Sequence, residues 1–293
     1  MRILPRPFSQ VLGDALNSIT RTWRPIVSTA SLVFVPVGLL SLLIFRWTGA
    51  TEFLEIVIND PGVLQTLSDE VLFELIDSFL VATAIAAGLQ TLATVFVYLA
   101  AHKIISGELA GSMITGHQAR RFALGRYPLA LASSLIALVL VIGLGALGVL
   151  VWSIPFAGRG GGGFVVFLFL IACVAPALWM AVGLSMLTPV VALERRGLVA
   201  GLVRSFELVK PRWGSTLGYL AVVGLLGTVS AQLIQLIALP LASLDNLSLG
   251  ISVASIIGLF AQGLIVGGIG SMWTVWYVDL RARIEPLVTA DLG

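Results

Sequence analysis

The chain has 293 residues, of which 58% are hydrophobic and only 11% charged, and its net charge is +2. A soluble domain carries about a quarter of its residues as charged ones, so this composition excludes an ordinary soluble protein. The single cysteine, Cys173, also excludes a disulfide framework and a thiolate metal site. The bilayer is therefore the expected solvent for most of the chain.

Six apolar runs are long enough to cross a bilayer, because about 20 helical residues span ~30 Å of hydrocarbon. They are residues 25–45, 79–101, 129–152, 164–193, 216–241 and 251–278. Backbone groups in lipid must be hydrogen-bonded within their own segment, so we expect helices rather than barrel strands. The fourth run exceeds one crossing, and we expect it to tilt or to kink at Pro176. The predicted fold is one all-α polytopic membrane domain over residues 1–293.

The distribution of Lys and Arg predicts how the chain is threaded. The segments 1–24, 102–128, 194–215 and 279–293 hold 15 of the 17 basic residues, and only Arg46 and Arg159 fall on the other side. The positive-inside rule then places both termini in the cytoplasm. No signal peptide is visible, and Arg outnumbers Lys as in GC-rich bacteria, so we expect a bacterial cytoplasmic membrane.

The segments before the first, third and fifth runs look alike. Each contains a glycine (Gly13, Gly116 or Gly201) and then basic residues and an aromatic residue just before the apolar run. We call them lead-ins and predict three repeats of a cytoplasmic amphipathic helix followed by a transmembrane hairpin. In the third lead-in the apolar positions Leu198, Leu202, Phe206 and Val209 share one helical face. We expect this face to lie in the bilayer boundary while Arg204 points away from it.

The cations of the second and third lead-ins are the predicted binding site, because the cytoplasmic leaflet is anionic. They are Arg120, Arg121, Arg195, Arg196, Arg204, Lys210 and Arg212. The expected partners are anionic membrane lipids, with a protein partner or a second copy of the chain as alternatives. A simpler alternative is that these cations only fix the topology and that the lead-in helices only pack under the bundle.

Polar and small residues within the runs suggest how the helices pack. We find no ionisable residue in the runs away from their ends, which argues against a proton- or sodium-coupled pump. The strongest polar groups are Gln90, Gln232, Gln235 and Gln262. They would form interhelical hydrogen bonds or, alternatively, line a substrate path. Close helix packing, with an oligomer contact as the alternative, is predicted at Gly214, Gly218, Gly263 and Gly267.

The remaining segments give no sign of catalysis. The connection 46–78 is acidic and carries a helical apolar stripe that would extend into the second run, so we expect an amphipathic outer helix there. The glycine-rich stretch 157–164 lacks the Lys and the strand of a phosphate loop and is predicted to be a flexible outer hairpin. His102 and His117 have no neighbouring ligands, so no metal or cofactor site is expected. With no catalytic or nucleotide motif, we expect neither an enzyme nor a nucleic-acid partner.

Three segments resemble one bacterial family. They are "LPRPFSQVLGDALNSITRTWRPI", "LERRGLVAGLVRSFELVKPRWGSTLGYL" and "WTVWYVDLRAR". They resemble the glycerophosphoryl diester phosphodiesterase membrane domain and its six-helix relatives of unknown function. The residues that match the family pattern are Glu194, Arg204, Ser205, Leu208, Lys210 and Trp213. In the two-domain relatives catalysis belongs to a soluble barrel that follows the membrane part, and we do not expect that activity here.

These observations predict a non-enzymatic membrane protein that acts as a lipid- or partner-binding scaffold at the cytoplasmic membrane. An alternative is a transporter or exporter of a small or lipidic molecule, suggested by the glutamines and the interrupted helices. A third possibility is a structural subunit of a larger membrane complex, suggested by the acidic outer segment and the glycine faces.

Overall fold

The computed structural model describes residues 2–59, 62–63, 66–156, 163–242 and 247–289. About 89% of the chain is helical. Within the described ranges, six helical segments are long and apolar enough to cross a membrane. The architecture is that of an all-α polytopic membrane protein, as the composition and the apolar runs predicted.

The elements follow one another with short connections. In chain order they are β1 (Arg2–Ile3), α1 (Phe8–Trp47), α2 (Ala50–Asn59), α3 (Asp69–Leu109), α4 (Gly116–Phe156), α5 (Gly163–Leu184), α6 (Leu187–Leu193), α7 (Leu198–Val209), the 3₁₀ helix η2 (Lys210–Arg212), α8 (Trp213–Ala242), α9 (Leu247–Ile284) and β2 (Leu287–Val288). β1 and β2 form an antiparallel pair, with Ile3 opposite Leu287. The beginning and the end of the described chain therefore lie side by side.

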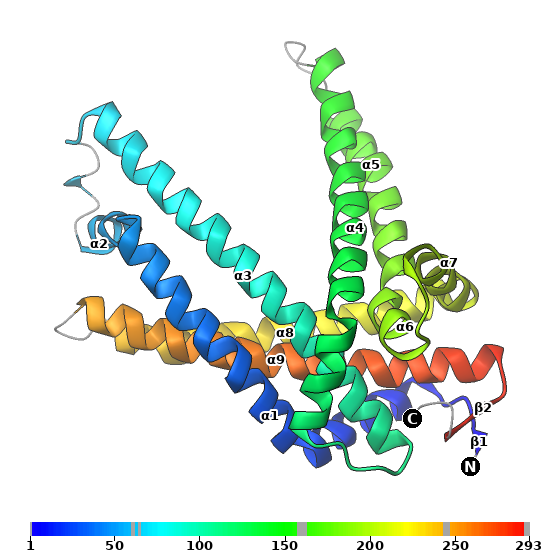
Figure 1. The fold of residues 1–293 in the computed structure, drawn as a ribbon. Helices are drawn as coiled ribbons and strands as arrows, with labels where there is room; N and C mark the ends of the chain where they lie inside the picture. Colours follow the sequence, from blue (N-terminus) through cyan, green and yellow to red (C-terminus); the bar gives the residue numbers. More distant parts are fainter. Residues whose placement is uncertain (1, 60–61, 64–65, 157–162, 243–246, 290–293) are drawn as a thin grey trace.

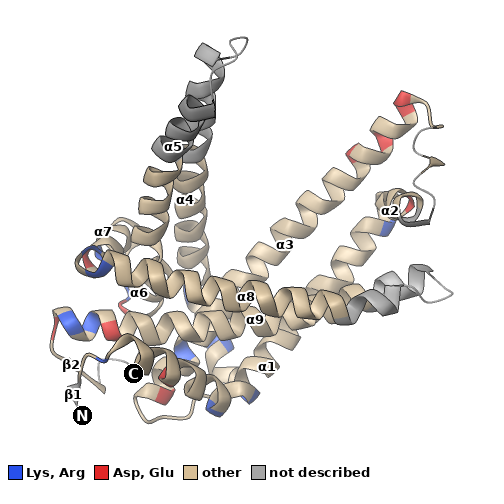
Figure 2. Cartoon of the chain, turned by 180° about the vertical axis from the view of Figure 1, so that it is seen from behind, with Lys and Arg blue, Asp and Glu red and all other residues tan. Residues whose placement is uncertain are grey.

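Helical hairpins diverge from one end of the molecule (Figure 1). They are α1 with α3, α4 with α5, and α8 with α9, and their far ends stand apart. Most Lys and Arg residues lie at the end where the hairpins meet and where β1 and β2 lie (Figure 2). We call it the basic end and the opposite end the distal end. Arg46, in the last turn of α1, is a cation at the distal end.

The first two lead-ins do not form separate helices. α1 runs without interruption from Phe8 through Pro25 and Pro36 to Trp47, and α4 runs from Gly116 to Phe156. At the start of α4, Gln118 Oε1 accepts from the Thr115 N–H over 3.0 Å and the Gln118 N–H donates to Thr115 Oγ1 over 3.3 Å, which is a capping box. The third lead-in differs, because η2 with Pro211 interrupts the regular helix between α7 and α8. Only α7 is thus a distinct lead-in helix.

The structure also defines the helix boundaries in the fourth run and in the acidic connection. The fourth run is divided between α5, which contains Pro176, and α6, with a turn at Ser185 and Met186 between them. There the Ser185 hydroxyl donates to the Val182 carbonyl oxygen over 2.6 Å, a local bond that competes with the helical ladder. The acidic connection 46–78 contains α2 and the first turns of α3, so it is helical as its apolar stripe predicted. The predicted hairpin at 157–162 lies outside the described residues.

An aromatic cluster forms the core of the basic end. The rings of Tyr219 on α8 and Trp276 on α9 stack at 4.7 Å, and Phe8 of α1 meets both edge-on. Tyr277 is fully buried beside them. Trp276 and Tyr277 look like interfacial residues in the sequence because they end an apolar run. They are buried because α9 continues to Ile284 and the start of α1 covers this end.

Glycines on α9 set its distance from α1. A Cβ atom at Gly263 would lie 2.7 Å from Phe34 Cδ2, and one at Gly267 would lie 2.5 Å from Ile26 Cγ2. The packing role predicted for these two glycines is therefore correct. The prediction is wrong within this chain for Gly214 and Gly218 on α8, because a Cβ atom there would meet no described atom within 4 Å.

Candidate functional site: an interhelical cavity and a basic end

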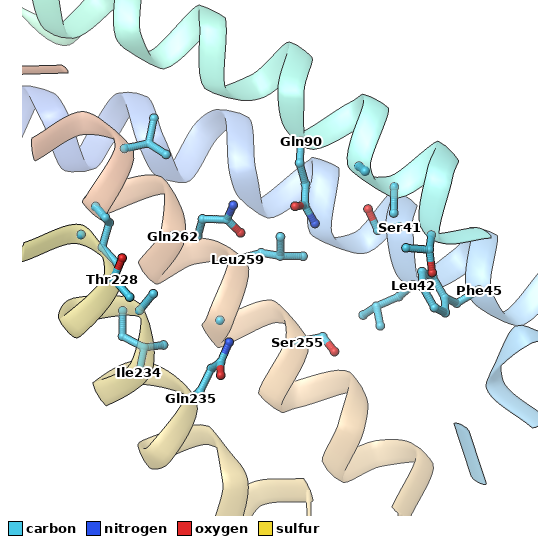
Figure 3. Close-up of a pocket in the computed structure, with 18 of the residues that line it drawn as sticks. Ser41, Leu42, Phe45, Gln90, Thr228, Ile234, Gln235, Ser255, Leu259 and Gln262 are labelled. Atoms are coloured by element: carbon cyan, nitrogen blue, oxygen red, sulfur yellow. The ribbon is translucent and has the colours of Figure 1, made fainter. Parts of the chain in front are cut away.

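A cavity of about 940 Å³ lies between the α1–α3 and α8–α9 hairpins (Figure 3). We call it the interhelical cavity. α1, α2, α3, α8 and α9 all contribute to its wall. Ligand sites for small molecules measure about 300–1,000 Å³, so the cavity has the size of such a site.

The cavity begins where the contact between α1 and α9 ends. A Cβ atom at Gly38 of α1 would lie 3.1 Å from Leu259 Cδ1 of α9, so the two helices still touch at this level. One turn further toward the distal end, Ser41 and Leu42 face the cavity instead. On the α2 side the rings of Phe45, Phe53 and Phe79 pack together, with Phe79 at 6.0 Å from Phe45 and 5.1 Å from Phe53. These contacts fix the wall made by α1, α2 and α3.

Amide side chains from separate helices enter this largely apolar cavity. Gln90 comes from α3, Gln235 from α8 and Gln262 from α9 (Figure 3). Hydroxyl groups add to the polar lining at Ser41, Thr51, Thr83, Thr228 and Ser255. The alternative interpretation of the glutamines, a polar lining, thus describes their position. Gln232 is exposed and does not line the cavity.

The polar lining lacks both charge and hydrogen-bond partners. None of the described lining residues is Asp, Glu, Lys, Arg or His. Ser41 is 5% exposed and its Oγ has no hydrogen-bond partner. A buried polar group left in this state costs about 1–3 kcal/mol. Within the described part of the chain no side-chain hydrogen bond joins Gln90, Gln235 or Gln262 to another residue either. The cavity therefore offers donors and acceptors that the rest of the chain leaves unused.

Sequence reasoning missed Ser41. A serine in an apolar run normally bonds to its own helix backbone, as Ser31 of α1 does through its 2.7 Å bond to the Val27 carbonyl oxygen. Nothing in the sequence distinguishes Ser41 from such a residue. The distinguishing property is its position at the level where α1 leaves α9, which only the fold reveals.

The basic end contains the cations that the sequence singled out. Arg120, Arg121, Arg195, Lys210 and Arg212 form no ion pair with any described residue, and all except half-buried Arg120 are exposed. Arg196 donates to Glu194 Oε2 over 2.7 Å and is partly exposed. Arg195 has φ of 55°, a left-handed conformation that glycine usually adopts at the end of a helix. These cations remain available to an anionic partner.

Arg204 does not belong to that exposed set. It is 7% exposed, and its Nε lies 3.1 Å from Glu194 Oε2 while its Nη2 lies 3.1 Å from Glu285 Oε1. The predicted outward orientation of Arg204 is therefore wrong. The buried face of α7 is formed by Gly201, Arg204, Ser205 and Leu208. It packs closely against α6, because a Cβ atom at Gly201 would lie only 3.1 Å from Val191 and 3.3 Å from Leu187.

The apolar face of α7 also packs against protein rather than facing outward. Phe206 lies against Gly183 and 5.1 Å from the ring of Trp179 on α5, and Val209 is fully buried. The exposed apolar residues of α7 are Val199, Ala200 and Val203. The prediction is wrong for Val209, and α5 covers part of Phe206, since helical periodicity identifies an apolar face but not what covers it.

A network around Glu194 holds α6, α7 and α9 together. The Tyr277 hydroxyl donates to Glu194 Oε1 over 2.9 Å, and Arg281 lies 4.0 Å from the same oxygen. Glu285 pairs with Arg281 and Arg204. Partial burial acts to raise the pKa of Glu285, but the hydrogen bond and charge of Arg281 and the charge of Arg204 outweigh it and lower that pKa below its ordinary value.

The two histidines do not converge on a site. His102 is buried on α3, with Nδ1 at 2.8 Å from Thr274 Oγ1 of α9. The Thr274 hydroxyl donates to the Gly270 carbonyl oxygen over 2.8 Å, so His102 Nδ1 must be the donor in the first contact. His117 is exposed on α4. Among the described residues no group of three or more His, Cys, Asp or Glu is placed to hold a metal ion.

Comparison with known proteins adds no assignment. The chain matches no family model, no curated protein and no solved structure.

Proposed function

We propose that this chain is a lipid-binding integral membrane protein that holds a lipidic molecule in the interhelical cavity. The observation that carries this proposal is the entry of three amides, from α3, α8 and α9, into an uncharged and otherwise largely apolar cavity of about 940 Å³. Apolar walls with a few oriented polar groups are typical of small-molecule sites. Gln235 and Gln262 are exposed, so the cavity is open to its surroundings and hydrocarbon chains could extend out of it.

The proposed threading places the basic end in the cytoplasm of a bacterium. It rests on the positions of 15 of the 17 Lys and Arg residues. Arg120, Arg121, Lys210 and Arg212 would then face the anionic inner leaflet, where each cation gains about 1 kcal/mol. The headgroup contact would position the protein, while the cavity would select the molecule bound. No catalytic step is part of this proposal.

The test of binding is the lipid that accompanies the full-length protein extracted from its own membrane. Bound lipid is measured by mass spectrometry for the wild type and for Gly258→Phe, because Gly258 lines the cavity and has open space at its Cβ position. We expect the variant to lose the retained lipid severalfold. Gly125→Phe on α4 is the matched control, since Gly125 also has open space but lies outside the cavity. Equal lipid in all three proteins would refute the proposal.

The threading has its own test. A phosphatase reporter placed near residue 160 should be active, because that enzyme requires export, whereas a fluorescent protein fused after residue 293 should fold and fluoresce in the cytoplasm. An active phosphatase at the C-terminus would reverse the orientation.

Transport of the same class of molecule is the second candidate function. The exposure of Gln235 and Gln262 favours it, because a cavity open to its surroundings allows a ligand to enter and leave. In reconstituted vesicles the wild type should accelerate exchange of a fluorescent lipid between leaflets, and Gly258→Phe should abolish the acceleration. A wild type that retains lipid but leaves exchange unchanged would restrict the function to binding.

A further inference from the structure

We infer that the interhelical cavity selects an uncharged diacyl lipid with a free hydroxyl group, such as a diacylglycerol, and excludes lipids that carry a charged headgroup. This inference rests on the proposed lipid binding and names the class of molecule that the cavity would take.

The absence of charge in the lining excludes an ionised group on the ligand. The described lining residues offer amides and hydroxyls but no cation that could neutralise a phosphate and no anion for an ammonium group. An ion moved from water into such surroundings loses its hydration without gaining a counter-charge. The cations of the basic end cannot compensate, since Arg120, Arg121 and Lys210 do not line the cavity. The part of the ligand held here must therefore be neutral.

The unused hydrogen-bonding groups require a ligand with both acceptors and a donor. Each glutamine amide presents two N–H donors and a carbonyl acceptor, and the Ser41 hydroxyl can donate one bond and accept others. Gln90, Gln262 and Ser41 come from α3, α9 and α1, so they surround the upper part of the cavity from three helices (Figure 3). Ester carbonyl oxygens would accept from the amide N–H groups. A free hydroxyl would donate to an amide oxygen or to Ser41.

Ser41 makes the polar site specific rather than incidental. Only 5% of Ser41 is exposed. Its Oγ has no hydrogen-bond partner, although the residue lines the cavity. An amide on a mobile, exposed side chain can find solvent, but a buried hydroxyl cannot. A ligand oxygen in the cavity would be the partner that this hydroxyl lacks.

The apolar lining accounts for the hydrocarbon part of the ligand. Leu42 and Phe45 of α1, Phe79 of α3, and Leu259 and Ile265 of α9 line the same cavity as the polar groups. Contact between this apolar surface and acyl chains stabilises binding only modestly, because lipid already surrounds the surface in a bilayer. The discrimination between lipids should therefore come from the polar groups and from the exclusion of charge.

The experiment uses the full chain in nanodiscs of phosphatidylcholine. The probe is a diacylglycerol with a photoreactive group on one acyl chain, and the crosslinked peptides are identified by mass spectrometry. We expect labelling of peptides that carry cavity residues of α3 and α9. Unlabelled diacylglycerol should displace the probe, whereas phosphatidic acid with the same chains should require at least about tenfold more.

Side-chain replacements then test the hydrogen bonds. Gln→Met keeps nearly the same length and removes both donor and acceptor, so Gln90→Met with Gln262→Met should weaken probe binding about tenfold, equivalent to about 1.4 kcal/mol. Ser41→Ala should weaken it severalfold with little change in volume. Gln232→Met is the matched control and should bind the probe like the wild type, because Gln232 is exposed outside the cavity.

The outcomes separate this inference from the proposed function. If phosphatidic acid competes as well as diacylglycerol, or if the Gln90 and Gln262 replacements bind normally, the inference is wrong but lipid binding stands. If no lipid probe labels cavity peptides, both are wrong, and water or nothing fills the cavity. A thermal unfolding scan of each variant shows that the comparison concerns folded protein, and Ser41→Ala supplies the test should the double variant fail to fold.

Discussion

Arg204 on α7 donates from its Nε to Glu194 Oε2 over 3.1 Å, and both side chains are almost completely buried. The pair joins the end of α6 to the middle of α7, across the turn that contains Arg195. A second carboxylate, Glu285, reaches Arg204 from beyond the end of α9. A cation that the sequence predicted to bind an external anion therefore stabilises the basic end itself.

Removing Arg204 should destabilise the protein strongly. Arg204→Met would leave Glu194 with fewer partners in a buried position, and breaking a buried pair costs about 3–5 kcal/mol. Because Tyr277 and Arg281 still contact Glu194, we expect the lower part of that range. Thermal unfolding of the detergent-purified protein measures the loss. Arg212→Met, at an exposed site without an ion pair among the described residues, should change stability by less than about 0.5 kcal/mol. Similar losses in the two variants would contradict the structural role of Arg204.

Stability should depend on pH through Glu285. Its pKa is lowered in the folded protein from an ordinary value of 4.5, so the unfolded chain takes up its proton first as the pH falls. The stability that Glu285 contributes is therefore complete above that ordinary value and is lost as the pH drops through the lower folded pKa. The unfolding temperatures of wild type and Glu285→Gln should differ by a constant amount above about pH 5 and converge below pH 4.5. A difference that persists unchanged to pH 3 would exclude this linkage.

The glycines of α8 and α9 should respond oppositely to alanine. Gly263→Ala places a methyl group 2.7 Å from Phe34 Cδ2, so we expect a loss of about 1–3 kcal/mol from overpacking. Gly218→Ala meets no described atom within 4 Å and should be neutral or stabilising by up to about 1 kcal/mol, because alanine favours helix. Unfolding measurements on both variants decide the point. A change in oligomeric mass with Gly218→Ala would instead identify that face of α8 as a contact between copies.

Arg195 should be replaceable by glycine with a gain in stability. Its φ of 55° is left-handed, which costs a residue with a Cβ atom about 1–2 kcal/mol and costs glycine almost nothing. Arg195→Gly should therefore raise stability by about 0.5–1 kcal/mol, whereas Arg195→Ala keeps the strain and removes only the charge. If both variants lose affinity for anionic lipid in nanodiscs while only the glycine variant gains stability, the arginine is retained for its charge. A destabilised glycine variant would show that the guanidinium holds the turn.

The number and placement of the long helices could be predicted, but not where they end. Apolar runs mark the part of a helix that suits hydrocarbon, and helix formation continues beyond it at little cost once started. α1 and α3 therefore extend past the predicted runs at the basic end, to Phe8 and to Leu109. The break at Ser185 could not be predicted either. Proline indicates a helix break in a sequence, whereas a serine does not show that it will bond to its own backbone.

The polar residues of the cavity were partly visible in the sequence. Glutamines are conspicuous in apolar runs, and three of the four selected ones line the cavity. Ser41 and the true surroundings of Arg204 could not be found in this way. Both depend on which helices meet, and the partner Glu285 lies 81 positions from Arg204, so no local pattern connects them.

The packing of Phe34 against Gly263 has a consequence for permeability. Phe34 forms a buried cluster with Ala93, Val97 and Val266, and this cluster lies on the basic-end side of the cavity between α1, α3 and α9. The ring rests directly on the bare backbone of α9, so these helices are closely packed at this level. A path through the cavity toward the basic end between α1, α3 and α9 would therefore require the Phe34 ring to move away from the α9 backbone.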